Sequence, residues 1–186
     1  MNKNNKKDKW QVQEDQIIKD CQNKNIGAYK MIYDRYEQPL LHTALRITGQ
    51  YQDAEDAVQM TFIKLYKSIG NYHFGAKFST YLFKILINTC FDLLKKKGRI
   101  KTSDIDLNKI SASPYNSLDE KIYLEDAILK LPDRMRACFV LFAVEGVPQN
   151  EIANILNISV GGVKSNVFHA KSRLRAFLSN PDVEVN

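Results

Sequence analysis

The sequence predicts an all-α protein of two small helical domains joined by a flexible linker, the second a three- to four-helix domain with a helix-turn-helix. Apolar residues recur at helical spacing over most of the chain, and no strand-like alternation rises above noise. Residues 100–116 lose this spacing and gain Ser, Asn and Pro, a composition typical of a linker. With 44% hydrophobic residues among 186, the chain can form one mid-sized or two small cores.

The first domain is expected to be a bundle of four helices. Pro39 lies inside the second of them, 28–48, where it should kink the helix or mark a break. Interruptions of the helical pattern fall at Ile26-Gly27, at Gly49-Gln50 and in the loop from Gly70 to Ser79. The expected boundaries are 1–11 for a disordered basic N-terminus, 12–99 for the first domain, 100–116 for the linker, 117–180 for the second domain and 181–186 for a tail.

The second domain begins with a helix that carries a start signal and a stop signal. Ser117 and Glu120 have the spacing of a capping box, and the helix is expected to run to Leu131. Pro132 then starts the next helix, at a position where its missing N–H costs little. Gly146 closes that helix.

Residues 148–175 predict two short helices around a tight turn. Asn157 lies where the chain must turn, since Asn tolerates the left-handed conformation, and Ser159 is a natural N-cap for the following helix. The residues expected to be buried are Ile152, Ala153 and Leu156 in the first helix and Val163, Val167, Ala170 and Leu174 in the second. The opposite face of the second helix carries Lys164, Ser165, Phe168, His169, Ser172 and Arg175. A globular core cannot use this basic, aromatic-bearing face, so DNA is the leading partner.

Composition limits the class of protein further. The formal net charge of +6 suits an acidic polymer as partner, although an ordinary basic soluble protein can carry the same charge. Cys21, Cys90 and Cys138 lack metal-ligand spacing, and the last two lie in apolar helical stretches where buried free thiols are common. We therefore expect a reducing, cytoplasmic location and no membrane span, signal peptide, metal or cofactor.

The helix expected over 53–69 has two different faces. Its core stripe is formed by Ala54, Val58, Phe62, Leu65 and Ile69. The opposite face carries Asp53, Asp56, Gln59, Met60 and Ile63, with Lys67 beside them. Two sizeable apolar side chains among carboxylates suit a protein partner; the alternative is a solvated face whose carboxylates only favour the helix N-terminus. Because no His or Cys joins the carboxylates, no catalytic residue is assigned here.

The next helix, 80–97, is expected to bury Leu82, Ile85, Leu86, Thr89 and Leu93. Its other side aligns Lys84, Asn88 and Lys95, flanked by Tyr81 and Phe91. Ammonium groups can follow a phosphate backbone and exposed aromatic rings can stack on unpaired bases, so this side suits single-stranded nucleic acid.

The segments at the two ends of this helix extend the same surface. The preceding loop supplies Asn71, Tyr72, His73 and Lys77, whose side chains can line a pocket for an unstacked base. Phe74 and Phe78 in the same loop are better explained as core residues that close the end of the bundle. The run LLKKKGR, which contains Lys95, Lys96 and Arg99, either meets duplex phosphates or only complements the helix dipole.

Taken together, four blocks of this sequence resemble the sigma-70 family of bacterial RNA polymerase initiation factors, in its extracytoplasmic-function group. The blocks are AYKMIYDRYEQPLLHTALRITG, DAEDAVQMTFIKLYKSI, FGAKFSTYLFKILINTCFDLLKKKGR, and LPDRMRACFVLFAVEGVPQNEIANILNISVGGVKSNVFHAKSRLR, and they cover roughly residues 12 to 178. The resemblance implies two helical domains, named regions 2 and 4, and a promoter-specificity subunit that is not an enzyme.

The resemblance also implies a role for each surface. The face with Asp53, Asp56, Gln59, Met60 and Ile63 is implied to dock on core RNA polymerase. The −10 element, as a melted strand, is implied to meet Asn71, Tyr72, His73, Lys77, Tyr81, Lys84, Asn88, Lys95, Lys96 and Arg99. The −35 element, as duplex, is implied to meet Gln149, Lys164, Ser165, Phe168, His169, Ser172 and Arg175. The family further implies an anti-sigma factor as a partner.

Three positions depart from the family's pattern. Arg is frequent in relatives where this chain has Lys164 and His169, and neither side chain reproduces the bidentate fork of arginine on guanine. Tyr81 stands where Trp is common, which keeps stacking and changes size.

Two other functions remain alternatives. An autonomous helix-turn-helix regulator would use residues 1–97 for sensing or dimerisation and would bind a two-fold symmetric site without polymerase. A nuclease lacks support, because His42, His73 and His169 are scattered and no carboxylate cluster has metal-ligand spacing.

Overall fold

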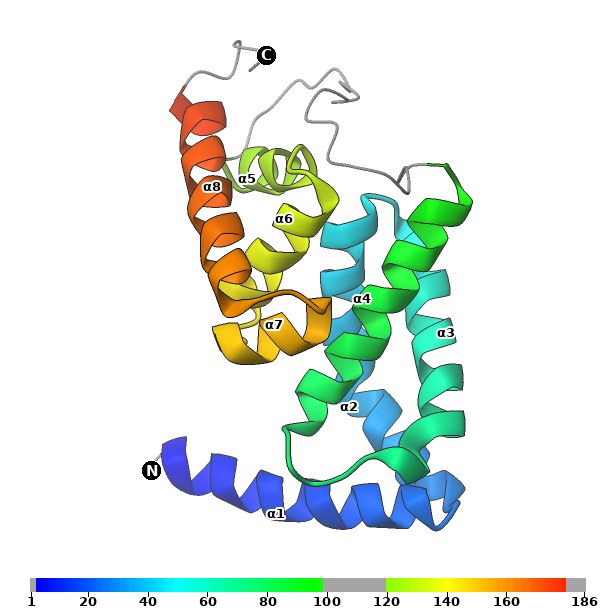
Figure 1. Cartoon of the computed structure of the whole chain (residues 1–186). Helices are drawn as coiled ribbons and strands as arrows, with labels where there is room; N and C mark the ends of the chain where they lie inside the picture. The colour runs from blue at the N-terminus through cyan, green and yellow to red at the C-terminus, as the bar shows by residue number, and fades with distance from the viewer. Residues whose placement is uncertain (1–2, 99–119, 180–186) are drawn as a thin grey trace.

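The computed structural model describes residues 3–98 and 120–179, in which all regular secondary structure is helical (Figure 1). In chain order the elements are α1 (Lys3–Gln22), α2 (Ile26–Thr48), α3 (Tyr51–Ser68), η1 (Ile69–Asn71), α4 (Phe78–Lys96), α5 (Glu120–Leu129), α6 (Asp133–Phe139), η2 (Val140–Val144), α7 (Gln149–Leu156) and α8 (Val160–Ser179). The first domain comprises α1 to α4 and the second α5 to α8. The predicted all-α, two-domain fold is confirmed.

The first domain is built around α2, which packs against α1, α3 and α4. Its core lies where the apolar stripes of the four helices meet. The fully buried side chains there include Ile18, Ile32, Leu65, Leu82 and Leu86. Burying one such side chain contributes roughly 1.5–3 kcal/mol, so these stripes are the main source of stability for the bundle.

The turns between the helices follow from single residues. Asn25 caps α2, since its Oδ1 accepts hydrogen bonds from the N–H groups of Gly27 (2.9 Å) and Ala28 (3.3 Å). Gly49 ends α2 at φ 72°, a left-handed conformation that favours glycine, and α3 begins two residues later. The two predicted interruptions at these positions are confirmed.

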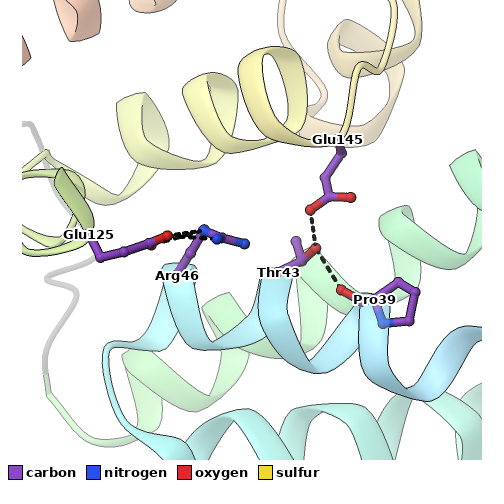
Figure 2. A network of polar contacts seen from close by, with 5 residues as sticks. All are labelled: Pro39, Thr43, Arg46, Glu125 and Glu145. Atoms are coloured by element: carbon purple, nitrogen blue, oxygen red, sulfur yellow. Dashed lines mark hydrogen bonds and ion pairs between the residues drawn. The ribbon is translucent and has the colours of Figure 1, made fainter. Parts of the chain in front are cut away.

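The first domain departs from the sequence prediction in two places. Helix α1 begins at Lys3, so most of the segment 1–11, which we predicted to be disordered, has helical backbone. Helix α2 is continuous through Pro39 (Figure 2), so the helix break that the sequence offered as one outcome at this position is absent. Pro39 is exposed, and water can hydrogen-bond to the carbonyl group that loses its helical donor.

The second domain packs α5, α6 and α7 against α8. Gly146, at φ 65°, follows the second predicted helix, as expected. That helix continues from α6 into a π-helical turn, η2, which periodicity did not predict. Pro132 is the N-cap of α6, and α5 ends at Leu129, two residues before the predicted end.

Several sequence predictions lie outside the described residues: the linker 100–116, the capping residue Ser117, the C-terminal tail and Arg99. Cys90 and Cys138 are buried free thiols, as predicted, and Cys21 is a third. None of the helices within 3–98 and 120–179 is long and apolar enough to cross a membrane.

Replacement of Leu82 by Ala tests the core assignment. Leu82 is fully buried, so the variant loses contacts on every side and leaves a cavity. We expect the free energy of unfolding to fall by about 2–5 kcal/mol. Met31→Ala on exposed α2 surface is the control and should change stability by less than about 0.5 kcal/mol. Urea denaturation followed by circular dichroism measures both; equal losses would contradict the assignment.

Candidate nucleic-acid interface

The helix-turn-helix forms through the local signals that the sequence contains. Asn157 adopts φ 51° and ψ 51° between α7 and α8, the left-handed turn predicted for it. Ser159 Oγ accepts a hydrogen bond from the N–H of Gly162 at 3.0 Å and so caps α8. The residues predicted to be buried are indeed buried: Ile152, Ala153, Leu156, Val163, Val167, Ala170 and Leu174.

The outward face of α8 presents the residues that the sequence placed there. Lys164, Ser165, Phe168, His169, Ser172 and Arg175 are all exposed, while Gln149 on α7 is half-buried. Phe168 is 70% exposed, and its ring meets the ring of His169 edge-on at 5.5 Å. An aromatic ring that exposed contributes little to a core, and Lys164 is exposed one helical turn before it. This face has the character of a major-groove reading surface.

The outward side of α4 forms a second cationic surface. Lys84, Asn88, Lys95 and Lys96 are exposed along it, and Phe91 is half-buried beside them. Neither ammonium groups nor an amide on this side are drawn into the core, so they are available to phosphates and bases.

The loop before α4 presents only part of the predicted set. Asn71, His73 and Lys77 are exposed. Phe74 is 45% exposed, with Lys19 Nζ 5.7 Å from the centre of its ring, whereas Phe78 is buried. The expectation that both phenylalanines belong to the core therefore holds for Phe78 alone.

Tyr72 was predicted to contact DNA, and that prediction is wrong. Its side chain is 5% exposed, and its ring lies edge-on to Phe78 at 5.4 Å. Its hydroxyl donates to the carbonyl oxygen of Ala76 at 2.6 Å, and burial raises its pKa to about 12. Tyr72 instead fixes the shape of the loop that carries the exposed residues.

Two further contacts that the sequence did not indicate hold this loop. Gln22 Nε2 donates to the carbonyl oxygens of Ile69 (3.1 Å) and Tyr72 (2.9 Å). Tyr81 is half-buried, its ring packs 5.2 Å from that of Tyr72, and its hydroxyl lies 2.8 Å from Ser68 Oγ. Tyr81 therefore has only part of its ring free for stacking. Glutamine at the end of α1 has no periodic signal that could have identified it.

The outward face of α3 is confirmed as an exposed, partly apolar surface with one exception. Asp56, Gln59, Met60 and Ile63 are exposed, Met60 to 42% and Ile63 to 47%. Asp53, which was predicted on the same face, is 1% exposed, and Lys97 Nζ donates to its carboxylate. The prediction that Asp53 is available to a partner is wrong; its ion pair ties the start of α3 to the end of α4. One cation of the LLKKKGR run, Lys97, therefore forms an ion pair within the protein.

The described residues contain no group of three or more His, Cys, Asp or Glu side chains placed to hold a metal ion. The site consists of three exposed surfaces: the outward faces of α8, α4 and α3. The faces of α8 and α4 present cationic, aromatic and amide or hydroxyl side chains, whereas the face of α3 presents carboxylate, amide and apolar side chains, and these side chains are suited to binding.

Comparison with protein families gives two matches that follow the two domains. The model described as sigma-70 region 2 matches residues 32–100, and that described as sigma-70, region 4 matches residues 121–174. SigW of Bacillus subtilis, named an extracytoplasmic-function RNA polymerase sigma factor, is 31% identical over 85% of this chain and 92% of its own length. SigE of Mycolicibacterium smegmatis, also named an extracytoplasmic-function RNA polymerase sigma factor, is 32% identical over 76% of this chain. That match covers 58% of the length of SigE.

Solved structures give the same picture of the fold. The chain is similar to the sigma factor RpoE of Bartonella quintana, solved with the anti-sigma factor NepR. The TM-score is 0.65 and the identity 25%, over 83% of this chain and 98% of that one. It also resembles CnrH, solved with the cytosolic domain of CnrY, at a TM-score of 0.68 and 24% identity, over 90% of this chain and 97% of that one.

Exchange of Asp53 for Asn tests the correction on α3. The neutral amide leaves Lys97 without its charged partner and puts an imperfect partner in a buried position. We expect a loss of about 1–3 kcal/mol in the free energy of unfolding. The matched change Asp56→Asn, on the exposed side of the same helix turn, should leave stability within about 0.5 kcal/mol. Thermal denaturation compares the two, and equal effects would contradict the burial of Asp53.

Proposed function

The chain belongs to the sigma-70 family of RNA polymerase sigma factors, in its extracytoplasmic-function group, and on this premise we propose which partner each of its exposed surfaces binds. Sigma factors are non-enzymatic promoter-specificity subunits. In our proposal the outward face of α3 binds core RNA polymerase, α8 reads the −35 element as duplex, and α4 with its preceding loop engages the −10 element as a melted strand.

The observation that carries the proposal is the exposure of Phe168 on the outward face of α8. A recognition helix enters the major groove with its outward side chains, and Lys164 and His169 lie beside Phe168 on that side. Phe168 offers an apolar contact for a thymine methyl group, while Lys164 offers a single ammonium donor. Because positions 164 and 169 carry no arginine fork, base selection there depends more on the apolar contact of Phe168 than on bidentate hydrogen bonds.

The −10 assignment is supported by the separation of roles within α4 and its loop. The rings of Tyr72 and Phe78 hold the loop, while Asn88 and Lys84 stand outward and free of the aromatic cluster. Opening a base pair costs on the order of 1–2 kcal/mol per step, which a few phosphate and stacking contacts can offset. The chain therefore needs only binding energy, with no bond chemistry of its own.

The polymerase assignment rests on α3. An exposed patch that includes Met60 and Ile63, rimmed by Asp56 and Gln59, has the composition of a protein interface. We further propose an anti-sigma factor as a partner, since RpoE of Bartonella quintana was solved with one.

The polymerase surface is tested by changing Asp56 and Ile63 together to Arg. Two added cations and the loss of the apolar side chain should weaken binding to core polymerase by at least about tenfold, or about 1.4 kcal/mol, which is the loss of one interface hot spot. Asp56→Glu with Ile63→Met keeps the charge and the apolar area and should bind normally. Gel filtration with core polymerase measures retention. Failure of the unmodified chain to join core polymerase would refute the proposed function.

The −35 surface is tested by Phe168→Ala. We expect a loss of about 1–3 kcal/mol on the preferred promoter and a relaxed preference at the contacted base, because a base-edge contact is removed. Leu178→Ala, an exposed apolar residue near the end of the same helix, is the control and should not change preference. In vitro transcription on a set of −35 variants measures both; a uniform loss on every promoter would contradict base reading by Phe168.

A further inference from the structure

The loop before α4 is held in place by hydrogen bonds from side chains to its backbone. We call residues 71–77 the reading loop, because they carry the proposed −10 contacts Asn71, His73 and Lys77. A segment without continuous helical or strand pairing keeps one shape where other donors satisfy its carbonyl groups. The carbonyl oxygens that accept from side chains, within this loop and next to it, are those of Ser68, Ile69, Tyr72 and Ala76.

The donors to these carbonyl groups come from three elements. Tyr72 lies in the loop itself, and Tyr81, in α4, donates to the carbonyl oxygen of Ser68 at 3.0 Å. Gln22 is the last residue of α1, and its partners Ile69 and Tyr72 lie 47 and 50 positions later in the chain. An amide nitrogen carries two hydrogens, so one Gln22 side chain serves both carbonyl groups. The reading loop is thereby tied to a helix outside its own hairpin.

The two bonds from Gln22 fix the backbone on both sides of Asn71. The carbonyl group of Ile69 belongs to the peptide bond before Gly70, and that of Tyr72 belongs to the peptide bond before His73. A peptide group is planar, so a fixed carbonyl oxygen sets the orientation of the whole group. The directions in which Asn71 and His73 leave the backbone therefore depend on a side chain of α1.

Helix α1 can act as a support because it is itself anchored. Ile18 and Cys21, in its last two turns, are fully buried, and α1 packs against α2 and η1. The buried carboxylate of Glu14 accepts a hydrogen bond from the hydroxyl of Tyr36 on α2. A side chain at the end of such a helix has a fixed starting point, so Gln22 can hold the loop in one place.

We propose that Gln22 is a positioning residue for −10 reading, which presents the reading loop to the melted strand in one preformed conformation. This inference rests on the proposed function of the loop and α4. A preformed loop loses little conformational freedom on binding, and it cannot change shape to accept a base that fits poorly. Gln22 thus affects base preference through the loop and makes no contact with DNA.

The first experiment measures the order of the loop in the full chain without polymerase. Gln22→Met keeps the length of the side chain and removes the donor. We expect the NMR backbone order parameters of residues 71–77 to fall from about 0.85 to about 0.6 or below, while those of α2 and α4 stay unchanged. A reading loop that stays equally rigid in this variant would overturn the proposal. Loss of helicity throughout the domain would also overturn it, because Gln22 would then support the core.

Gln16→Met is the matched control in the same helix. Gln16 is exposed, and its Nε2 donates to Asp20 Oδ1 at 3.0 Å within α1. The substitution therefore removes the same amide group without touching the loop. We expect the order parameters of residues 71–77 to remain at the value of the unmodified chain. A loss of order equal to that of Gln22→Met would show that the two loop contacts are not responsible.

The second experiment measures base preference with the holoenzyme formed from core polymerase. In vitro transcription on promoters changed at single −10 positions gives the ratio between the preferred base and the other three. Gln22→Met should lower this ratio about three- to tenfold, the worth of about one net hydrogen bond, and leave −35 preference unchanged. Gln16→Met should change neither preference. An equal loss of transcription on all −10 variants would contradict positioning of the loop.

Two more variants test whether the donor at position 22 is responsible. Gln22→Glu keeps the size of the side chain but places acceptors against two carbonyl oxygens, so it should lower the −10 ratio at least as much as Gln22→Met. Gln22→Lys keeps N–H donors on a chain that can reach both carbonyl groups, and it should restore the ratio. A lysine variant no better than the methionine variant would overturn the proposal.

The two experiments also separate this proposal from the proposed function. If the unmodified chain fails to join core polymerase, the proposed function is refuted, while the order parameters of the free chain still decide whether Gln22 holds the loop. If the unmodified chain directs transcription with a −10 preference that Gln22→Met leaves intact, the positioning role is refuted and the proposed function stands.

Discussion

The arrangement of the molecule depends on the burial of α2 from two sides. On one side its apolar residues Ile32, Leu40 and Ile47 are part of the core with α1, α3 and α4. On the other side the helix meets α5, α6 and η2 through Thr43 and Arg46. Both sets of contacts are made by one continuous helix, because α2 is not interrupted at Pro39. The positions of the remaining helices, and of the surfaces they carry, follow from that one element.

The exposed surfaces are a consequence of this packing. Each outer helix contributes one stripe to a core and leaves the opposite arc to solvent, so α8 can offer Phe168 and α3 can offer Ile63 without loss of stability. The same rigid backbone that buries Val163 and Val167 fixes the direction in which the outward side chains of α8 point. Recognition and packing therefore occupy complementary halves of the same helices.

Sequence periodicity was sufficient to predict the buried residues of a helix that has one buried side. It gave the stripe of α8 and the turn at Asn157, because the hydrophobic period and the left-handed residue are local signals. It failed for Asp53, since the partner Lys97 lies 44 residues away and a helical angle near the edge of the core does not show which way a carboxylate turns. It failed for Tyr72 for a related reason: a loop has no period, and an aromatic ring in it suits either a core or a base.

In helix α4, sequence periodicity missed residues that the structure buries. The pattern predicted one buried stripe, in which Ile85 and Leu93 are only half-buried, while Phe83 and Ile87 are buried on the side that faces α7. Which side of an apolar helix meets a second domain depends on a contact made by residues about 70 positions later, such as Thr80 with Glu151. No window of local sequence contains that information. It required the fold.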